Sequence, residues 1–418
     1  MNEILLDIGQ LVLGPVQPQG LVRGAAMQAV EAVPDAWLAV SDGRVEAWGR
    51  MADWPADRFT GYARTDARGR VVLPGFVDSH THLIFGRTRE GEFVRRLRGE
   101  TYEQIAAAGG GILNSARHLA ELSEDELLEG ALARVQEITA TGTTCFEVKT
   151  GYGLLPAQEL KLLRVAHRLR AAVPHRVRIT LLAAHALPAD YRDRRHEFLD
   201  RVCTELVPAA AAIGADYIDV FCEIGFFTPE ETERVLRCGA DHGLAGRVHA
   251  NELDFSGGVE VGVRCGARSV DHLECVGDEQ IAALLASETI PTVLPGTALF
   301  LGLPYAPARR MIDSGLGMAL ASDYNPGTCP TGNMGLIWAL ACVGLRLLPE
   351  EALVAATANG AAALDWAVEL GRLRAGFRAD LLLTRPIESF HRIPYSFGSN
   401  LIDRVMIGGE WWTGSEGA

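Results

Sequence analysis

Eight short apolar segments, alternating with helical segments, constrain the fold of this chain more than any other feature. Such alternation is typical of β-then-α units around a parallel sheet. Eight units predict an α/β fold with a closed (β/α)8 barrel, whose active site forms at the carboxyl ends of the strands. The expected strands span residues 71–78, 143–149, 177–184, 217–223, 247–250, 269–272, 289–294 and 318–322. The expected helices include residues 124–140, 156–172, 229–241, 278–286 and 307–314.

Shorter β segments flank this region at both ends of the chain. The N-terminal ones lie at 4–6, 11–13, 36–40 and 45–48, and Asp42-Gly43 between the last two predicts a hairpin. The C-terminal ones lie at 381–384 and 405–407. We expect both ends to form one small composite β-sandwich domain, from residues 1–70 and 366–418, around a barrel domain of residues 71–365.

The composition argues against several classes of protein. Hydrophobic residues make up 48% and charged residues 22% of the chain, as in globular proteins with a sizeable core. The formal net charge is −14 and no stretch concentrates Lys and Arg, which argues against nucleic acid or an anionic membrane as a partner. The chain shows no signal-peptide pattern and no membrane-spanning apolar run, and its eight cysteines are scattered. These features predict a cytoplasmic protein.

The first expected strand ends in a pair of histidines, His80 and His82. Side chains two residues apart share one face of a strand, so both imidazoles would point the same way. Convergent imidazoles form half of a catalytic metal site. The pair alone is weak evidence in a chain with 11 histidines, so the other ligands must come from equivalent places.

Polar residues follow the other strands where a barrel gathers its active site. A chance distribution would also scatter histidines over helices and loops, as it does for His118, His167 and His196. The concentration at strand ends therefore favours a functional site. The residues are Lys149 and Tyr152 after the second strand, His185 after the third, Glu223 at the fourth, His249 and Glu252 at the fifth, His272 at the sixth, Thr297 after the seventh and Asp323 at the eighth.

The expected metal ligands are His80, His82, His249 and Asp323. Three imidazoles and a carboxylate bind one divalent ion and leave room for water, as in catalytic sites. Such an ion lowers the pKa of a bound water to roughly 7 and polarises a carbonyl oxygen, which predicts a hydrolase for an amide-like or amidine-like carbon. An Asx turn before Pro326 is the alternative explanation for Asp323. Its position at the eighth strand, beside the first in a closed barrel, favours a ligand.

Three residues are candidates for proton transfer, and the sequence leaves the choice of general base among them open. Asp323 would accept the proton of the attacking water, while Glu252 and His272 would shuttle protons or polarise the carbonyl. Glu252 can face the pocket together with His249 if the chain leaves the strand at Asn251. A buried core histidine is the alternative explanation for His272.

Several longer motifs resemble the amidohydrolase superfamily and, within it, the imidazolonepropionase family. They are residues 77–82, 147–153 (EVKTGYG), 184–188 (AHALP), 249–252 (HANE), 271–274 (DHLE), 322–328 (SDYNPGT), and Thr101-Tyr102 leading into 109–112 (GGGI). The resemblance implies hydrolytic opening of 4-imidazolone-5-propanoate to N-formimidoyl-L-glutamate in histidine degradation. It also implies a Zn²⁺ or Fe cofactor, between which the sequence does not choose, and a homodimer.

The same resemblance implies the residues that hold the substrate, a small molecule with a carboxylate. They are Arg89, Tyr102, Tyr152, His185, Glu252, Asn325, Gly327 and Thr328. A guanidinium at Arg89 suits a carboxylate in an acidic protein. A solvated arginine in Arg87-Thr88-Arg89 is the alternative explanation.

Two departures and two alternatives bear on this interpretation. Binuclear members of the superfamily carry a carboxylated lysine at the end of the fourth strand, where this chain has Glu223, so we expect one metal per subunit. A metal pair bridged by Glu223 is the alternative. Ser79 replaces the Pro or Cys of many relatives and would point away from the metal.

Another cyclic amidase, or a deaminase for a different heterocycle, is the nearest alternative function. A non-enzymatic barrel would lack ligand positions, and all four are present.

Overall fold

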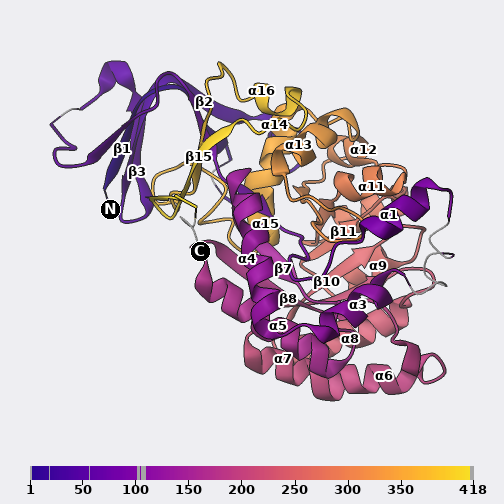
Figure 1. Cartoon of the computed structure of the whole chain (residues 1–418). Coiled ribbons are helices and arrows are strands. Elements are labelled where there is room, and N and C mark those ends of the chain that lie inside the picture. The colour runs from indigo at the N-terminus through magenta and orange to yellow at the C-terminus, as the bar shows by residue number, and fades with distance from the viewer. Residues whose placement is uncertain (1, 18, 56, 101–103, 105–109, 415–418) are drawn as a thin grey trace.

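The computed structural model describes the chain except for residues 1, 18, 56, 101–103, 105–109 and 415–418, so Tyr102 lies outside the described residues. Figure 1 shows a sheet built from the indigo N-terminal and yellow C-terminal segments, beside a larger barrel covered by helices. The expected fold class is therefore confirmed: an α/β barrel with a separate β domain formed by both ends of the chain.

Eight parallel strands form the barrel in the order of the chain. The first and last strands meet beyond their carboxyl ends, where the Asp323 N–H donates to the His80 carbonyl and the His82 N–H donates to the Tyr324 carbonyl, both at 2.9 Å. The barrel thus closes at expected site residues. The strands are β6 (Phe76–Asp78), β7 (Thr143–Lys149), β8 (Arg176–Ala184), β9 (Tyr217–Cys222), β10 (Ala245–Ala250), β11 (Ser269–His272), β12 (Ile290–Val293) and β13 (Ala319–Leu320).

Both ends of the chain contribute strands to the second sheet, in the order β16-β15-β14-β5-β1-β2-β3, with β4 paired to β1. The expected hairpin joins β2 to β3, and its turn residues Asp42 and Gly43 have φ of 49° and 75°, as a two-residue hairpin turn requires. The strands are β1 (Glu3–Pro15), β2 (Val30–Ser41), β3 (Arg44–Arg50), β4 (Ala63–Asp66), β5 (Val71–Pro74), β14 (Leu381–Thr384), β15 (Ile402–Ile407) and β16 (Glu410–Trp411). The domain boundaries given above stay predictions.

The single strand expected over residues 71–78 is wrong, because this segment forms two strands of different sheets. β5 pairs with β1 and β14, whereas β6 pairs with β7. The change occurs at Gly75, whose N–H donates to the Asp380 carbonyl, while the next N–H, of Phe76, donates to the Gly142 carbonyl, each at 3.0 Å. Glycine is required here, since a Cβ would lie 2.2 Å from the Thr144 hydroxyl oxygen.

Helices cover the outside of the barrel, and three of them have the bounds expected from the sequence. α4 (Glu124–Ala140) begins at a capping box of Ser123 and Glu126, and α8 (Pro229–Asp241) begins in the same way. α5 (Pro156–Ala172) begins with a proline, which suits the first turn of a helix. The other described α-helices are α1 (Glu90–Leu97), α3 (Ile112–Glu121), α6 (Arg195–Arg201), α7 (Val207–Ile213), α9 (Gly258–Arg264), α10 (Asp278–Leu285), α11 (Pro295–Leu301), α12 (Ala308–Asp313), α13 (Met334–Val343), α14 (Pro349–Val354), α15 (Gly360–Ala363) and α16 (Arg392–Tyr395). No described helix combines the length and apolarity needed to cross a bilayer.

Candidate metal centre and active site

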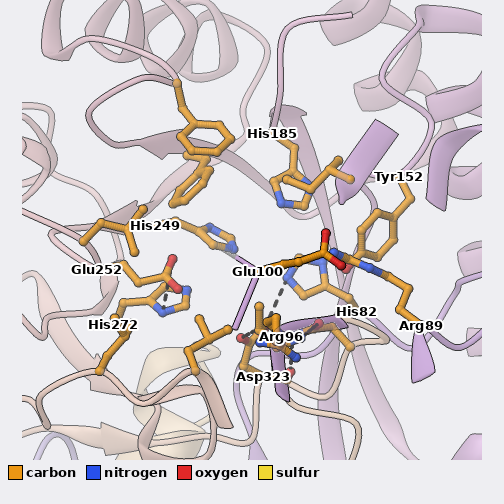
Figure 2. Close-up of a pocket in the computed structure, with 18 residues that line it drawn as sticks. His82, Arg89, Arg96, Glu100, Tyr152, His185, His249, Glu252, His272 and Asp323 are labelled. Atoms are coloured by element: carbon orange, nitrogen blue, oxygen red, sulfur yellow. Dashed lines mark hydrogen bonds and ion pairs between the residues drawn. The ribbon is translucent and has the colours of Figure 1, made fainter. Parts of the chain in front are cut away.

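The carboxyl ends of the barrel strands surround a cavity of about 500 Å³. Figure 2 shows His82, His185, His249 and Asp323 pointing toward one another around it, with Tyr152 and Arg89 on one side and Glu252 and His272 on the other. Among the described residues, the expected residues His80 and Gly327 are not part of the lining. The lining consists of His82, Arg89, Arg96, Glu100, Ile112, Tyr152, His185, Phe221, Phe226, His249, Glu252, Leu253, His272, Leu301, Leu303, Asp323, Asn325 and Thr328.

Four histidines and one aspartate form two overlapping clusters of potential metal ligands. His80, His82 and Asp323 offer ligand atoms within 4.8 Å of one another, and so do His80, His249 and His272. Asp323 Oδ1 lies 3.5 Å from His80 Nε2 and 3.6 Å from His82 Nε2. The His249 ring centroid lies 4.6 Å from that of His80 and 5.6 Å from that of His82. The four ligands expected from the sequence are thus neighbours at one end of the barrel.

The polar surroundings of His80 and His249 suit a metal ion. His80 Nδ1 donates to Asp271 Oδ2 at 2.7 Å, and His249 Nδ1 lies 3.0 Å from Asp219 Oδ2. The Nε2 atoms of both rings are buried and have no hydrogen-bond partner among the described residues. In His80 the bond to Asp271 holds the proton on Nδ1 and leaves the Nε2 lone pair free to coordinate. The contact of His249 Nδ1 with Asp219 is an ion-pair contact and does not have hydrogen-bond geometry. The donor set of imidazole nitrogens and one carboxylate therefore fits Zn²⁺ or Fe.

Three site residues depart from the usual backbone conformation. Asn251, His272 and Asp323 have φ of 55°, 87° and 55°. Residues other than glycine rarely adopt positive φ. Asn251 is held there because its Nδ2 donates to the Cys275 carbonyl at 2.9 Å. Since β10 ends at Ala250, this turn brings both His249 and Glu252 to the cavity, as the sequence predicted.

Comparisons with known proteins identify the family. Residues 269–412 match the amidohydrolase family. The chain is 44% identical to the imidazolonepropionase of Flavobacterium johnsoniae, over 93% of this chain and 94% of that protein, and 43% identical to that of Christiangramia forsetii, over 98% and 100%. The chain belongs to the imidazolonepropionase family. The resemblance inferred from the sequence motifs is therefore confirmed.

Solved structures outside the imidazolonepropionase family share the fold. The E. coli guanine deaminase superposes with a TM-score of 0.75 at 16% identity, over 98% of this chain and 99% of that one. An adenosine deaminase from Xanthomonas campestris with bound zinc gives 0.69 at 17% identity, over 98% and 92%. At these identities the likeness extends to the architecture alone.

Burial sets the protonation states of several side chains in and next to the cavity of this imidazolonepropionase-family chain. It lowers the pKa of His80 and His82 well below the usual value, so both rings are neutral and able to coordinate. It raises the pKa of Glu252 to about 8 and that of Asp323 to about 6. Glu252 Oε2 lies 3.8 Å from His272 Nδ1. At pH 7 Glu252 therefore holds a proton, while Asp323 is mostly ionised.

Hydrogen bonds hold the Arg89 and His185 side chains in place in the cavity lining. Arg89 Nε and Nη2 donate to Glu92 Oε2 at 2.9 and 2.6 Å, and its side chain is only 10% exposed, which argues against the solvated-arginine alternative. Its Nη1 lies against Gly327, where a Cβ would come within 2.2 Å. His185 Nδ1 donates to the Gly151 carbonyl at 3.0 Å. Gly327 therefore supports Arg89 from outside the cavity lining.

Glu223 contacts the backbone rather than either ligand cluster. Its Oε2 accepts hydrogen bonds from the N–H groups of Glu252 and Leu253, at 2.9 and 3.0 Å. Among the described residues, neither cluster of potential ligands includes Glu223. Its carboxylate therefore holds the turn that carries Glu252.

Sequence reasoning did not single out the partners of the histidines or the outer part of the cavity. Asp219 lies within β9 and Asp271 precedes the last residue of β11, so the search for polar strand ends gave neither a role, although Asp271 is part of the 271–274 motif. The signal was present in β9, where Asp219 interrupts an apolar strand. Arg96 and Glu100 line the cavity from α1 and the segment after it, which carry no motif used above.

Proposed function

We propose that this chain hydrolyses 4-imidazolone-5-propanoate to N-formimidoyl-L-glutamate, a step in the degradation of histidine. Water adds to the ring carbonyl carbon, the adjacent C–N bond breaks, and that carbon becomes a carboxylate. The observation that carries the proposal is the cluster of His80, His82 and Asp323 at the cavity, in a chain 44% identical over nearly its full length to a protein named imidazolonepropionase.

The proposed cofactor is one Zn²⁺ or Fe ion per subunit, held by His80, His82, His249 and Asp323. The free Nε2 atoms of His80 and His249 support this ligand set. When bound, such an ion supplies Lewis-acid polarisation of a carbonyl oxygen and a water of lowered pKa. Neutral imidazoles, kept so by burial, are the form that coordinates.

Three side chains place and move protons in the proposed reaction. Asp323 accepts the proton of the attacking water, and the Thr297 hydroxyl donates to its Oδ2 at 2.6 Å and so orients the carboxylate. Glu252, protonated at pH 7 because burial raises its pKa to about 8, donates a proton to the departing ring nitrogen. His272, whose Nδ1 lies 3.8 Å from Glu252 Oε2, shuttles protons beside it.

The outer part of the cavity binds the rest of the substrate. Arg89 pairs with the propionate, because its guanidinium lines the cavity and is fixed there by Glu92. His185 and Tyr152 contact the ring from the opposite side to Glu252 (Figure 2). The proposed substrate-binding set is Arg89, Tyr102, Tyr152, His185, Glu252, Asn325, Gly327 and Thr328.

The test follows the absorbance of imidazolonepropionate in the presence of metal-loaded and chelator-stripped protein. We expect the loaded protein alone to consume the substrate, with activity restored to stripped protein by Zn²⁺ or Fe²⁺. No turnover by loaded protein would defeat the proposal. Release of ammonia from guanine under the same conditions would instead support a deaminase.

The family likeness also supports a proposal about the assembled protein. We expect a cytoplasmic homodimer without a nucleic-acid or membrane partner. Light scattering coupled to size-exclusion chromatography gives the molar mass, and a value near 45.0 kDa, the mass of one chain, would contradict the dimer.

A further inference from the structure

Five fully buried charged side chains lie together inside the barrel: Glu147, Lys149, Asp219, Arg247 and Asp271. Lys149 Nζ donates to Glu147 Oε1 at 2.8 Å and to Asp219 Oδ2 at 2.7 Å, and lies 3.7 Å from Asp271 Oδ2. Arg247 Nη2 donates to Asp271 Oδ2 at 3.1 Å. Removing five charged groups from water costs free energy that their ion pairs offset only in part, so a buried network of this size contributes little to stability. Its presence therefore indicates another role.

The network touches two of the proposed metal ligands through its aspartates. Asp271 accepts a hydrogen bond from His80 Nδ1 at 2.7 Å. Asp219 lies 3.0 Å from His249 Nδ1 and also accepts from the His249 backbone N–H at 3.2 Å. Lys149 is within 4 Å of both aspartates, so one ammonium group links the supports of two ligands.

The choice of lysine at this position is unusual for the chain. Of its 39 cationic residues only Lys149 and Lys161 are lysines, and every other is arginine. An ammonium group is compact and has three rotatable donors, whereas a guanidinium is a rigid planar fork. Three carboxylates surround Lys149 Nζ, an arrangement that matches the ammonium and not the fork.

We propose that Lys149 is a positioning residue for the metal: it holds Asp271 and Asp219 beside the Nδ1 atoms of His80 and His249, so that both rings present Nε2 to one cation. This inference rests on the proposed metal site. Outer-shell carboxylates of this kind orient ligating histidines, and losing one costs about 10–100-fold in metal affinity. Lys149 acts one step further out, through both aspartates at once.

The direction in which metal affinity changes distinguishes a positioning role of Lys149 from a purely electrostatic effect of its charge. Removing a positive charge near a bound cation should strengthen metal binding by Coulomb's law. Losing the lysine that holds the two aspartates should weaken it, because the histidines lose their fixed orientation. A weaker metal affinity in a Lys149→Met variant therefore indicates positioning, and a stronger affinity indicates charge alone.

The first experiment measures Zn²⁺ affinity by competition with a chromophoric chelator. We expect Lys149→Met and Asp219→Asn each to weaken binding about 10–100-fold, and the double variant to lose less than the two single losses combined, because part of the lysine's effect passes through Asp219. Lys161→Met, the only matched substitution the chain offers, should bind as the wild type does. Unchanged or tighter binding by Lys149→Met, with native circular dichroism, or additive losses in the double variant, would overturn the inference.

A second experiment needs no substitution of Lys149 and holds even if Lys149→Met fails to fold. Protein labelled with ¹⁵N-lysine has only two side-chain signals, which the Lys161→Met variant assigns. On addition of Zn²⁺ to stripped protein, we expect the Lys149 ammonium signal to shift and the Lys161 signal to stay. Metal binding without a Lys149 shift would overturn the inference alone. A wild-type protein that binds no Zn²⁺ would overturn the proposed metal site and this inference together.

Discussion

Asp78 accepts two hydrogen bonds from Ser322, one from the backbone N–H at 3.0 Å and one from the hydroxyl at 2.5 Å. These bonds join the end of the first barrel strand to the loop after the last. The proposed ligand Asp323 follows Ser322 directly, and His80 lies two residues after Asp78. The seam of the barrel and the proposed metal site are therefore built by the same few residues.

Ser322→Ala tests this seam. The change leaves a buried carboxyl group with one fewer donor, so we expect the free energy of unfolding to fall by about 1–3 kcal/mol. We also expect metal affinity to fall, because the backbone of Asp323 loses its support. Urea unfolding and chelator competition measure the two effects. Ser389→Ala, which removes a hydroxyl from an exposed hydrogen bond with His391, serves as the control, and equal results for both variants would contradict the prediction.

Substitution of the proposed ligands should remove the metal without unfolding the protein. For His249→Ala and Asp323→Asn we expect metal affinity to fall by more than about 100-fold, beyond the loss typical of outer-shell partners. Elemental analysis of purified protein, with circular dichroism as the check on folding, measures this. His242→Ala changes an exposed histidine in the turn before β10 and should retain full metal content. A folded Asp323→Asn variant with wild-type metal content would exclude Asp323 as a ligand.

Arg89→Gln should weaken substrate binding more than it slows turnover. Loss of one charge-assisted pair costs about 1.5–3 kcal/mol, which corresponds to a rise in KM of about 10–150-fold. Steady-state kinetics separates KM from kcat. Arg87→Gln removes an exposed guanidinium two residues away and should leave both constants unchanged. A selective fall in kcat for Arg89→Gln would place Arg89 in the chemical step instead.

Gly327→Ala should displace the Arg89 guanidinium from the side that packs against residue 327. A Cβ at this position would lie 2.2 Å from Arg89 Nη1, so the guanidinium must move. We expect KM to rise about tenfold, the cost of one weakened ionic hydrogen bond, with metal content unchanged. Gly91→Ala in α1 is the control, because a Cβ there meets nothing within 4 Å. An unaltered KM in Gly327→Ala would show that Arg89 does not need this contact.

His175 should make the fold sensitive to acid. Burial lowers its pKa to about 4, while the unfolded chain has the usual value near 6.5. The unfolded state therefore binds the proton more readily, so stability is lost as pH falls from about 6.5 to 4. Between pH 7.5 and 5 this residue alone costs about 2 kcal/mol of unfolding free energy.

The measurement compares urea unfolding at pH 7.5 and 5 for the wild type, His175→Gln and His167→Gln. We expect the loss on acidification to shrink in His175→Gln only, because His167 is exposed. The other buried histidines contribute equally to all three proteins and cancel in the comparison. The same acid loss in all three proteins would refute a neutral, buried His175.

Local chemistry explains why much of the fold could be predicted. α4, α5 and α8 have the expected bounds because their first turns carry capping boxes or a proline, signals that lie within a few residues of the helix. The division of residues 71–78 could not be predicted in this way. It depends on whether the N–H groups of Gly75 and Phe76 bond to Asp380 or to Gly142, which are distant in the chain.

The candidate site shows the same contrast. His82, His249 and Asp323 could be predicted because a closed barrel brings strand ends together whatever the details of packing. The hydrogen bond from His80 to Asp271 could not, because it depends on which interior side chains of neighbouring strands face each other. The outer lining residue Glu100 follows from the path of a loop, which periodicity does not describe.

The passage of one continuous backbone from β5 to β6 has a practical consequence. Only Gly75 separates a strand of the terminal sheet from a strand of the barrel, and His80 follows five residues later. Excising the barrel as a minimal catalyst would require a cut between two consecutive strands, because Gly75 is the only residue between them. The two halves of the β domain are in this sense part of the catalytic scaffold, and fusions or insertions belong at other places in the chain.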